Sequence, residues 1–229
     1  MVANQEDSLQ ISSYYAQSRP EMRAILPPTR RRILEIGCSE GLFSGSITDA
    51  EEKWGVEPTQ SSAIKARTRL TRVIDKYFEE AKADLPKKYF DLIICNDVIE
   101  HMVDHEKFLT EIQEFMTNDG ALVGSIPNVR YYRNLFNLLI AKDWEYVDRG
   151  TLDRTHLRFF TEKSLRRSLE KAGFEIEKFQ GINGEVKFGM SKWKIAYFTF
   201  YALFRAVSLG GARDVAHLQF AFRVRLRRK

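Results

Sequence analysis

Two short runs that each contain a histidine carry the side chains best suited to acid–base or metal chemistry. Asp97, Glu100 and His101 belong to the run DVIEH, and His156 belongs to the run DRTH. Because the ordinary pKa of histidine is about 6.5, His101 and His156 are candidate catalytic bases near neutral pH. Asp97 is a third candidate catalytic residue beside them.

The same four residues also suit a divalent cation. If a helix begins after Asp97, the side chains at 97, 100 and 101 share one face, because positions three and four residues apart are neighbours on a helix. Two carboxylates and two imidazoles would hold an ion that orients a reacting oxygen. In a third interpretation, Asp97 and Glu100 cap the next helix and His101 only lines a pocket. The sequence leaves these interpretations open.

A glycine-containing loop indicates a second site, for a nucleoside ligand. Gly37 and Gly41 enclose the segment CSE directly after the apolar run RRILEI, and glycine permits a sharp turn and a close approach of the backbone to a ligand. Glu57 ends the next strand-like run, where a carboxylate can accept hydrogen bonds from ribose hydroxyls. The spacing G-x-x-x-G differs from the dinucleotide pattern G-x-G-x-x-G, but the loop and the acid together favour a ligand site over a simple turn.

The elements that must position these residues alternate along the chain. Strand-like runs are expected at 31–38, 54–58, 72–78, 90–99 and 121–127, and helices over 59–70, 105–116, 131–141 and 161–173. This alternation predicts a doubly wound α/β fold with a mostly parallel sheet, and ligands sit beyond the carboxyl ends of such strands. The alternating runs 174–179 and 217–226 are expected to pair as an antiparallel edge. Thr161 is the expected first cap of the helix over 161–173.

The composition excludes several classes of protein. A chain of 229 residues with 44% hydrophobic and 29% charged residues is not disordered throughout, and two cysteines do not make a disulfide framework. The polar amino terminus shows no secretory signal, so we expect a cytoplasmic location. The net charge of +5 comes from scattered basic clusters, and we do not expect a nucleic acid as partner.

Residues 12–180 resemble the class I S-adenosylmethionine-dependent methyltransferases. The resemblance rests on the motifs LEIGCSEG, GVEP, FDLIICNDVIEHM, GALVGSIPN and DRTHLRFFTEKSLRRSLEKAGF. It implies a Rossmann-like seven-stranded sheet with an antiparallel last strand. It also implies an N-terminal helical arm over 1–30 that covers the cofactor, and a methyltransferase domain over 31–229 with an acceptor lid at about 129–160.

The resemblance also assigns roles to single residues. The residues it places at S-adenosylmethionine are Tyr15, Arg19, Glu35, Gly37, Cys38, Gly41, Glu57, Pro58, Tyr77, Phe78, Asn96 and Asp97. Ser39 replaces the middle glycine that is common in the family. The set Asp97, Glu100, His101 and His156 is similar to that of metal-assisted O-methyltransferases, which implies Mg²⁺ or another divalent cation; those relatives usually carry glutamate at the position of Asp97.

The acceptor follows less directly from the sequence. The stretch from NVRYYRNL to DRTHLRFF is similar to methyltransferases of bacterial polysaccharide pathways, so the leading hypothesis is O-methylation of a glycan or of a nucleotide- or lipid-linked sugar. The alternative is the hydroxyl of a quinone precursor or polyketide. A non-enzymatic alternative is a pseudo-methyltransferase that binds the cofactor without turnover.

A strongly apolar segment at about 190–211 interrupts the second half of the chain. Its core IAYFTFYALF is shorter than the roughly 20 residues that span a bilayer. We expect a helical insertion, which either packs on the sheet, forms a homodimer contact or touches the inner face of the membrane peripherally.

Overall fold

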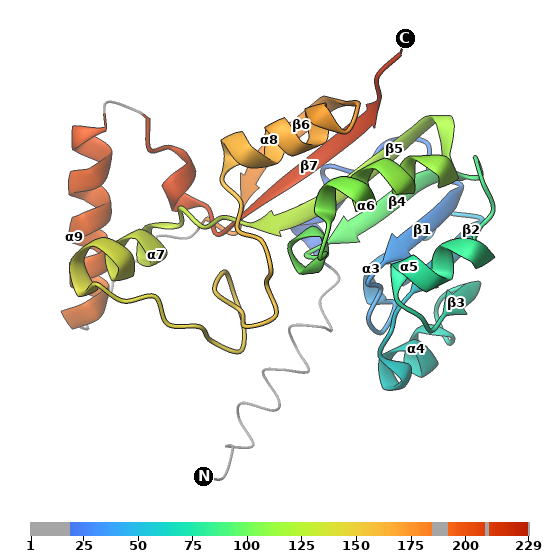
Figure 1. The fold of residues 1–229 in the computed structure, drawn as a ribbon, viewed down its shortest axis with the longest axis horizontal. Coiled ribbons are helices and arrows are strands. Elements are labelled where there is room, and N and C mark those ends of the chain that lie inside the picture. The colour runs from blue at the N-terminus through green and yellow to red at the C-terminus, as the bar shows by residue number, and fades with distance from the viewer. Residues whose placement is uncertain (1–18, 185–191, 209–210, 229) are drawn as a thin grey trace. The chain divides into compact units, whose positions relative to one another are not determined.

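The computed structural model describes residues 19–184, 192–208 and 211–228 (Figure 1). Within them, seven strands form a sheet of order β3-β2-β1-β4-β5-β7-β6. The strands are β1 (Arg32–Ile36), β2 (Glu52–Val56), β3 (Arg72–Ile74), β4 (Phe90–Asn96), β5 (Met116–Pro127), β6 (Phe174–Ile182) and β7 (Gln219–Leu226). β1 is parallel to β2 and β4, β2 is parallel to β3, and β6 is antiparallel to β7. The predicted doubly wound, mostly parallel α/β fold is therefore confirmed.

The helices between the strands are mostly short. They are α2 (Pro20–Arg23), α3 (Leu42–Gly45), α4 (Gln60–Ala66), α5 (Phe78–Ala81), α6 (His105–Glu111), α7 (Tyr132–Phe136), α8 (Glu162–Lys171) and α9 (Lys192–Val207). A π-helix, Asn137–Ala141, continues α7, and 3₁₀ turns occur at Lys82–Asp84, Ile99–His101, Ile112–Phe115 and Asp214–Ala216. In the described part of the chain, no helix combines the length and the apolar character needed to cross a bilayer.

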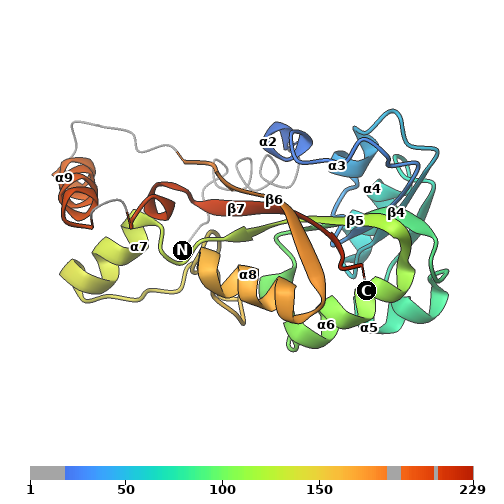
Figure 2. The same cartoon turned by 90° about the horizontal axis from the view of Figure 1, so that it is seen from above.

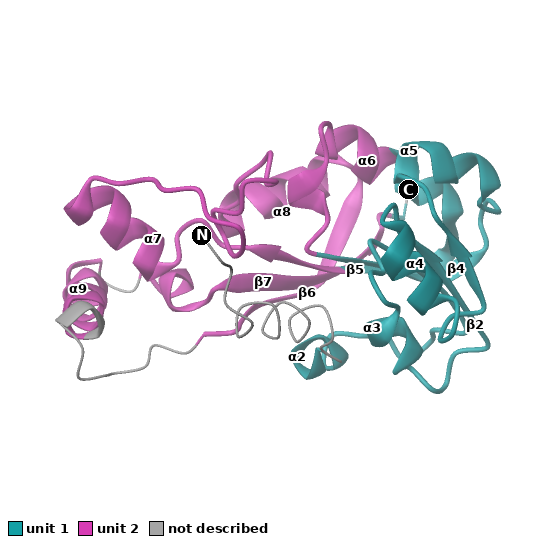
Figure 3. Ribbon diagram, turned by 90° about the horizontal axis from the view of Figure 1, so that it is seen from below, with its two compact units in different colours: residues 1–96, 111–123, 228 teal, residues 97–110, 124–227, 229 magenta. Residues whose placement is uncertain are grey.

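The chain divides into two compact units (Figure 3). Unit 1 comprises residues 1–96, 111–123 and 228, and unit 2 comprises 97–110, 124–227 and 229. In unit 1, α3 and α5 lie on opposite sides of the strands (Figure 2). In unit 2, α8 packs on β6, where the Arg166 guanidinium lies 4.0 Å from the centre of the Phe179 ring.

Two elements show how the sequence determines this packing. β4 is buried along Leu92–Cys95, as a central parallel strand requires. α8 begins with the predicted cap: the Thr161 hydroxyl accepts from the Ser164 N–H at 3.1 Å, and the Ser164 hydroxyl bonds back to the Thr161 N–H at 2.9 Å. Leu165 and Leu169 face the core from this helix.

Several predicted boundaries are wrong. β4 ends at Asn96 rather than at 99, because Asp97 takes a left-handed conformation with φ 53°. β5 begins at Met116 rather than at 121, so Gly120 lies inside the strand, where a Cβ would come 3.0 Å from the Phe90 carbonyl oxygen. Glycine there permits close strand packing.

Two further elements are shorter than the sequence predicts. β3 ends at Ile74, and Phe78 already begins α5. The helix predicted over 105–116 ends at Glu111, is followed by a 3₁₀ turn, and gives way to β5 at Met116. Residues 1–18 of the predicted arm, Tyr15 among them, and parts of the apolar segment 190–211 lie outside the described residues.

Candidate active site

The glycine loop of unit 1 follows β1 and turns through three left-handed residues. Gly37, Ser39 and Gly41 have φ of 67°, 47° and 72°. The Gly37 and Cys38 N–H groups both donate to the Val56 carbonyl, at 2.8 and 3.2 Å. The loop is thus anchored to the end of the neighbouring strand β2 and has a conformation that favours glycine.

Glu57 holds this loop in shape. Its Oε2 accepts the Ser39 N–H at 2.9 Å, and its Oε1 accepts the Thr59 N–H at 2.9 Å. The bond to Ser39 compensates the left-handed strain that a non-glycine residue brings to this position, roughly 1–2 kcal/mol. Each carboxylate oxygen keeps a second lone pair, so Glu57 can still accept hydrogen bonds from two ribose hydroxyls.

Glu35 is a buried acid beside the same loop. Its side chain accepts from the Ser44 N–H at 3.2 Å and is 4% exposed. Burial raises the pKa of Glu35 to about 7, although the hydrogen bonds from Ser44 and the charge of Arg19 oppose the shift. Arg19 itself lies 3.1 Å from Glu21 at the start of α2. A ligand that brings positive charge would favour the ionised form of Glu35.

Other predicted cofactor residues of unit 1 differ in how far their side chains are exposed. Cys38 packs with Ala66 and Leu70, and burial raises the pKa of its thiol far above the ordinary value, so its side chain is a core group rather than a nucleophile. Phe78 is likewise buried and packs edge-on against Phe115 at 6.2 Å. Tyr77 and Pro58 are exposed, so of the pair Tyr77–Phe78 only Tyr77 presents its ring to solvent.

Asn96 ends β4 with an unsatisfied amide. Both Nδ2 and Oδ1 are buried, and neither has a hydrogen-bond partner among the described residues. Buried polar groups are nearly always paired, so such a group indicates a ligand or an ordered water. Its place at the carboxyl end of a central parallel strand fits the predicted contact with the methionyl part of S-adenosylmethionine.

In unit 2 the structure brings together Glu100, His101 and His156, as predicted. One ligand atom from each lies within 4.8 Å of the others. The two imidazole rings meet edge to face at 4.7 Å, and His156 Nε2 lies 3.9 Å from Glu100 Oε1. Glu100 is 1% exposed and His156 is 9% exposed, so the carboxylate is almost fully shielded from water.

Backbone carbonyls orient both imidazoles. His156 Nδ1 lies 2.9 Å from the Thr151 carbonyl oxygen, and His101 Nδ1 lies 3.1 Å from the Thr155 carbonyl oxygen. A carbonyl only accepts, so Nδ1 carries the proton in each neutral ring and Nε2 keeps a free lone pair. Burial, and next the charge of His156, lower the pKa of His101, which favours that neutral form. This arrangement is typical of metal-binding histidines and suits a general base equally well.

Asp97 does not join this cluster. The condition that would have placed Asp97 on one face with Glu100 and His101 is not met, since the segment forms a single 3₁₀ turn at Ile99–His101 rather than an α-helix. The Asp97 Oδ1 accepts from the Ser125 hydroxyl and from the Gln219 amide, both at 2.8 Å. Sequence reasoning missed Ser125, Gln219 and the two threonine carbonyls, because backbone groups and contacts between distant residues leave no local pattern.

Comparison with known proteins agrees with this fold. The chain belongs to the methyltransferase-domain family, whose sequence pattern matches residues 9–178. A protein of Mycolicibacterium smegmatis named "Probable S-adenosylmethionine-dependent methyltransferase" is 30% identical over 66% of this chain and 55% of its own length. A ubiquinone biosynthesis O-methyltransferase of Azorhizobium caulinodans is 28% identical over 77% of this chain and 70% of its own length.

Solved structures share the fold at low sequence identity. A SAM-dependent methyltransferase from Archaeoglobus fulgidus aligns with a TM-score of 0.59 at 20% identity, over 97% of this chain and 94% of that one. The [4+2]-cyclase SpnF aligns with a TM-score of 0.56 at 18% identity, over 100% of this chain and 85% of that one. Because a cyclase shares the fold, the fold by itself does not establish methyl transfer.

Proposed function

We propose that this chain transfers a methyl group from S-adenosylmethionine to a hydroxyl oxygen, with the help of Glu100, His101 and His156. The observation that carries the proposal is the approach of three potential ligand atoms within 4.8 Å of one another. Relatives named ubiquinone biosynthesis O-methyltransferase support a phenolic acceptor of the quinone-precursor type.

The residues of unit 1 fit the cofactor. S-adenosylmethionine, when bound, supplies an electrophilic methyl group and leaves as S-adenosylhomocysteine. Glu57 would accept both ribose hydroxyls through the lone pairs that its backbone bonds leave. Asn96 would pair its buried amide with the methionyl part, and ionised Glu35 would stabilise the positive charge of the ligand.

The histidines can take up the proton of the acceptor. As the oxygen–carbon bond forms and the carbon–sulfur bond breaks toward sulfur, the hydroxyl proton must leave the oxygen. An unprotonated Nε2 on His101 or His156 accepts it, and the Thr155 or Thr151 carbonyl stabilises the resulting imidazolium through Nδ1–H.

The same atoms fit a divalent cation. The Glu100 carboxylate and the two Nε2 atoms would hold it, and an ion there would lower the pKa of an acceptor hydroxyl that it binds. Buried carboxylates are generally paired with a cation or coordinate a metal, and Glu100 is almost completely buried. A lone pair that binds an ion cannot accept a proton at the same time, so the metal-assisted and base-assisted forms of the proposal are separable.

Ion titration on metal-stripped protein tests the metal-assisted form. We expect one Mn²⁺ or Mg²⁺ to bind with measurable heat, and His156→Ala to abolish that heat. Asp97→Asn is the matched control: asparagine tolerates the left-handed conformation, and position 97 lies outside the cluster, so binding should persist. Turnover of a phenolic acceptor that survives chelation would reject metal assistance and leave the base-assisted form. Absence of all turnover on phenol and sugar panels, despite tight S-adenosylhomocysteine binding, would favour the pseudo-methyltransferase.

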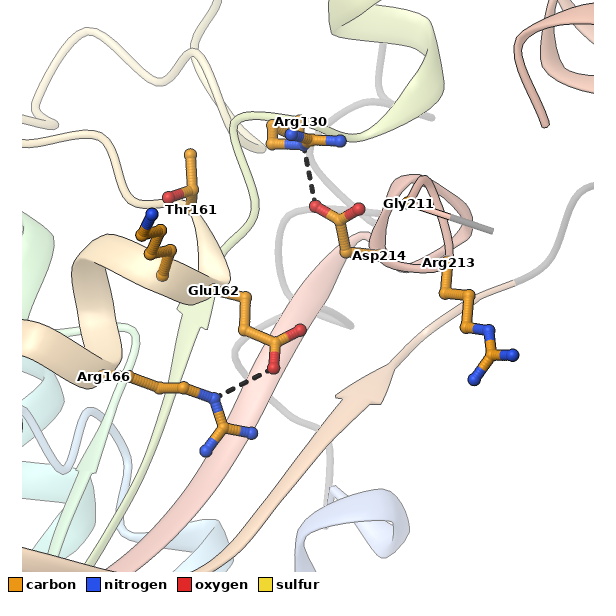
Figure 4. Close-up of a pocket in the computed structure, with 8 residues that line it drawn as sticks. Arg130, Thr161, Glu162, Arg166, Gly211, Arg213 and Asp214 are labelled. Atoms are coloured by element: carbon orange, nitrogen blue, oxygen red, sulfur yellow. Dashed lines mark hydrogen bonds and ion pairs between the residues drawn. The ribbon is translucent and has the colours of Figure 1, made fainter. Parts of the chain in front are cut away.

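A basic hollow in unit 2 favours a second candidate acceptor, a nucleotide- or lipid-linked sugar (Figure 4). The hollow has a volume of about 400 Å³ and is lined by Arg130, Thr161, Glu162, Lys163, Arg166, Gly211, Arg213 and Asp214. Arg130 pairs with Asp214 at 2.8 Å and Arg166 with Glu162 at 2.9 Å. Lys163 and Arg213 have no acidic partner among the described residues, so two cations remain for a phosphate group. Methylation of a sugar nucleotide, lost in Lys163→Ala with Arg213→Ala but not in Arg167→Ala, would favour this acceptor over a phenol.

A further inference from the structure

The helix α9 packs against the rest of unit 2 through one face. Phe136 contacts Tyr197 and Phe200 with ring centres 4.8 and 5.6 Å apart, and Tyr132 contacts Tyr201 at 5.6 Å. These contacts repeat at helical spacing, so positions 197, 200, 201 and 204 form the inner face of α9. Figures 1 and 2 both show α9 beside α7.

The outer face of α9 is apolar and unusually exposed. Ile195, Leu203 and Val207 are 44%, 62% and 81% exposed. Thr199, Ala202 and Ala206 are also exposed and uncharged, and Arg205 is the one charged residue among the exposed side chains that the structure describes on α9. The helix that precedes α9 in the chain, α8, shows the pattern that is ordinary for a surface helix. Its exposed positions are all charged: Lys163, Arg167, Glu170 and Lys171.

The π-helix after α7 exposes apolar side chains as well. Leu138, Leu139 and Ile140 are 46%, 56% and 57% exposed, and the Tyr197 hydroxyl bonds to Asn137 Oδ1 at 3.0 Å. This bond ties the π-helix directly to α9 within one unit. So many exposed apolar residues on two elements that are bonded to each other indicate an interaction surface rather than ordinary scatter.

The sequence of α9 indicates what covers the surface. α9 carries Lys192, Lys194 and Arg205 and contains no acidic residue. Its sequence also includes Trp193, a residue type that is enriched at the boundary between membrane and water. It does not meet the requirements for a membrane-spanning helix. A basic, aromatic helix with an apolar outer face matches a helix that lies in the plane of an anionic lipid surface.

We propose that α9 and the π-helix Asn137–Ala141 form an interfacial docking surface for anionic lipid membranes. The outer face of α9 enters the boundary between headgroups and acyl chains, together with Leu138, Leu139 and Ile140. The net positive charge of α9 favours an anionic over a neutral lipid surface. The proposal does not depend on methyl transfer, because docking needs neither cofactor nor acceptor.

Vesicle co-sedimentation of the full chain tests the docking surface. We expect binding to vesicles of mixed phosphatidylcholine and phosphatidylglycerol, little binding to phosphatidylcholine alone, and weakening by salt. Leu203→Glu should lower the partition coefficient about tenfold or more, since it places a charge where the proposal inserts an exposed leucine side chain into the lipid. Ile64→Glu is the matched control, because Ile64 is a 56% exposed residue of a helix in unit 1, and its vesicle binding should equal that of the wild type.

Three outcomes would overturn the proposal. The first is no binding of the wild type to anionic vesicles at low salt. The second is equal binding of wild type and Leu203→Glu, with circular dichroism confirming that both are folded. The third is a wild-type dimer that Leu203→Glu dissociates while vesicles bind neither protein, which would make a second copy of the chain the occupant of this surface.

Discussion

The glycine loop of unit 1 and the histidine cluster of unit 2 are stabilised in opposite ways. In the loop, Glu57 accepts N–H groups from Ser39 and Thr59, so the partners lie within about twenty positions of the chain. In the cluster, His101 and His156 meet from positions more than fifty residues apart and depend on two backbone carbonyls. The loop is therefore a local structure in which the Glu57 carboxylate keeps lone pairs for a ligand. The cluster is a tertiary structure in which the Nε2 atoms of the two histidines keep lone pairs that can take up a proton or bind a metal ion.

The largest effect should come from His156→Ala. If the cluster acts only in chemistry, turnover should fall about a hundredfold or more, as the loss of a general base or metal ligand typically causes. S-adenosylhomocysteine affinity, measured by titration calorimetry, should stay within about threefold. The control is His105→Ala, since His105 lies against Ser168 and Phe160 outside the cluster. An equal loss of cofactor affinity in His156→Ala would show that the two regions do not act separately.

The next effect concerns Glu57→Gln. An amide offers one acceptor oxygen and presents donors to the backbone N–H groups, so at least one charge-assisted hydrogen bond is lost, along with a ribose contact. We expect S-adenosylhomocysteine affinity to fall about a hundredfold and the melting temperature to decrease. Glu51→Gln, at an exposed pair with Arg31, should change neither quantity. Unchanged affinity in Glu57→Gln would remove the proposed ribose contact.

The smallest effect is the pH dependence that Glu35 contributes. Its pKa in the folded protein is raised from the ordinary 4.5 to about 7. The folded state therefore holds the proton more tightly, and the stability gained from it is full below about pH 4.5 and is lost as the pH rises to about 7. The melting temperature of Glu35→Gln relative to wild type should rise across this window and stay constant above it. A constant difference from pH 4.5 to 8 would show that Glu35 is ionised throughout.

The same contrast explains how far the sequence could predict the molecule. The strand alternation and the loop from Gly37 to Gly41 were predictable because apolar runs, glycine and a nearby acid are local signals. The end of β4 was not, since Asp97 takes a left-handed conformation held by Ser125 and Gln219 from other strands. The spacing of Asp97, Glu100 and His101 would place them on one face of a helix, if a helix began there. The structure forms a 3₁₀ turn instead, and Asp97 lies outside the cluster of Glu100, His101 and His156.

Hydrogen-bond partners taken from the backbone also escape prediction from sequence. The tautomers of His101 and His156 depend on the carbonyls of Thr155 and Thr151, which any residue could supply. The apolar character of α9 was readable, but its division into an attached and an outward face depended on the contacts of Phe136 and Tyr132.

The double hydrogen bond of Glu57 has a kinetic consequence. Because the carboxylate holds the N–H groups of Ser39 and Thr59 through hydrogen bonds within the protein, we expect that the loop need not rearrange during an encounter. Association that requires no slow conformational step proceeds at ordinary docking rates, about 10⁵–10⁷ M⁻¹s⁻¹ for protein partners and no slower for a small ligand. Cofactor binding should therefore follow a single exponential whose rate rises linearly with concentration, and differences in affinity between cofactor and product should reside in their dissociation rates.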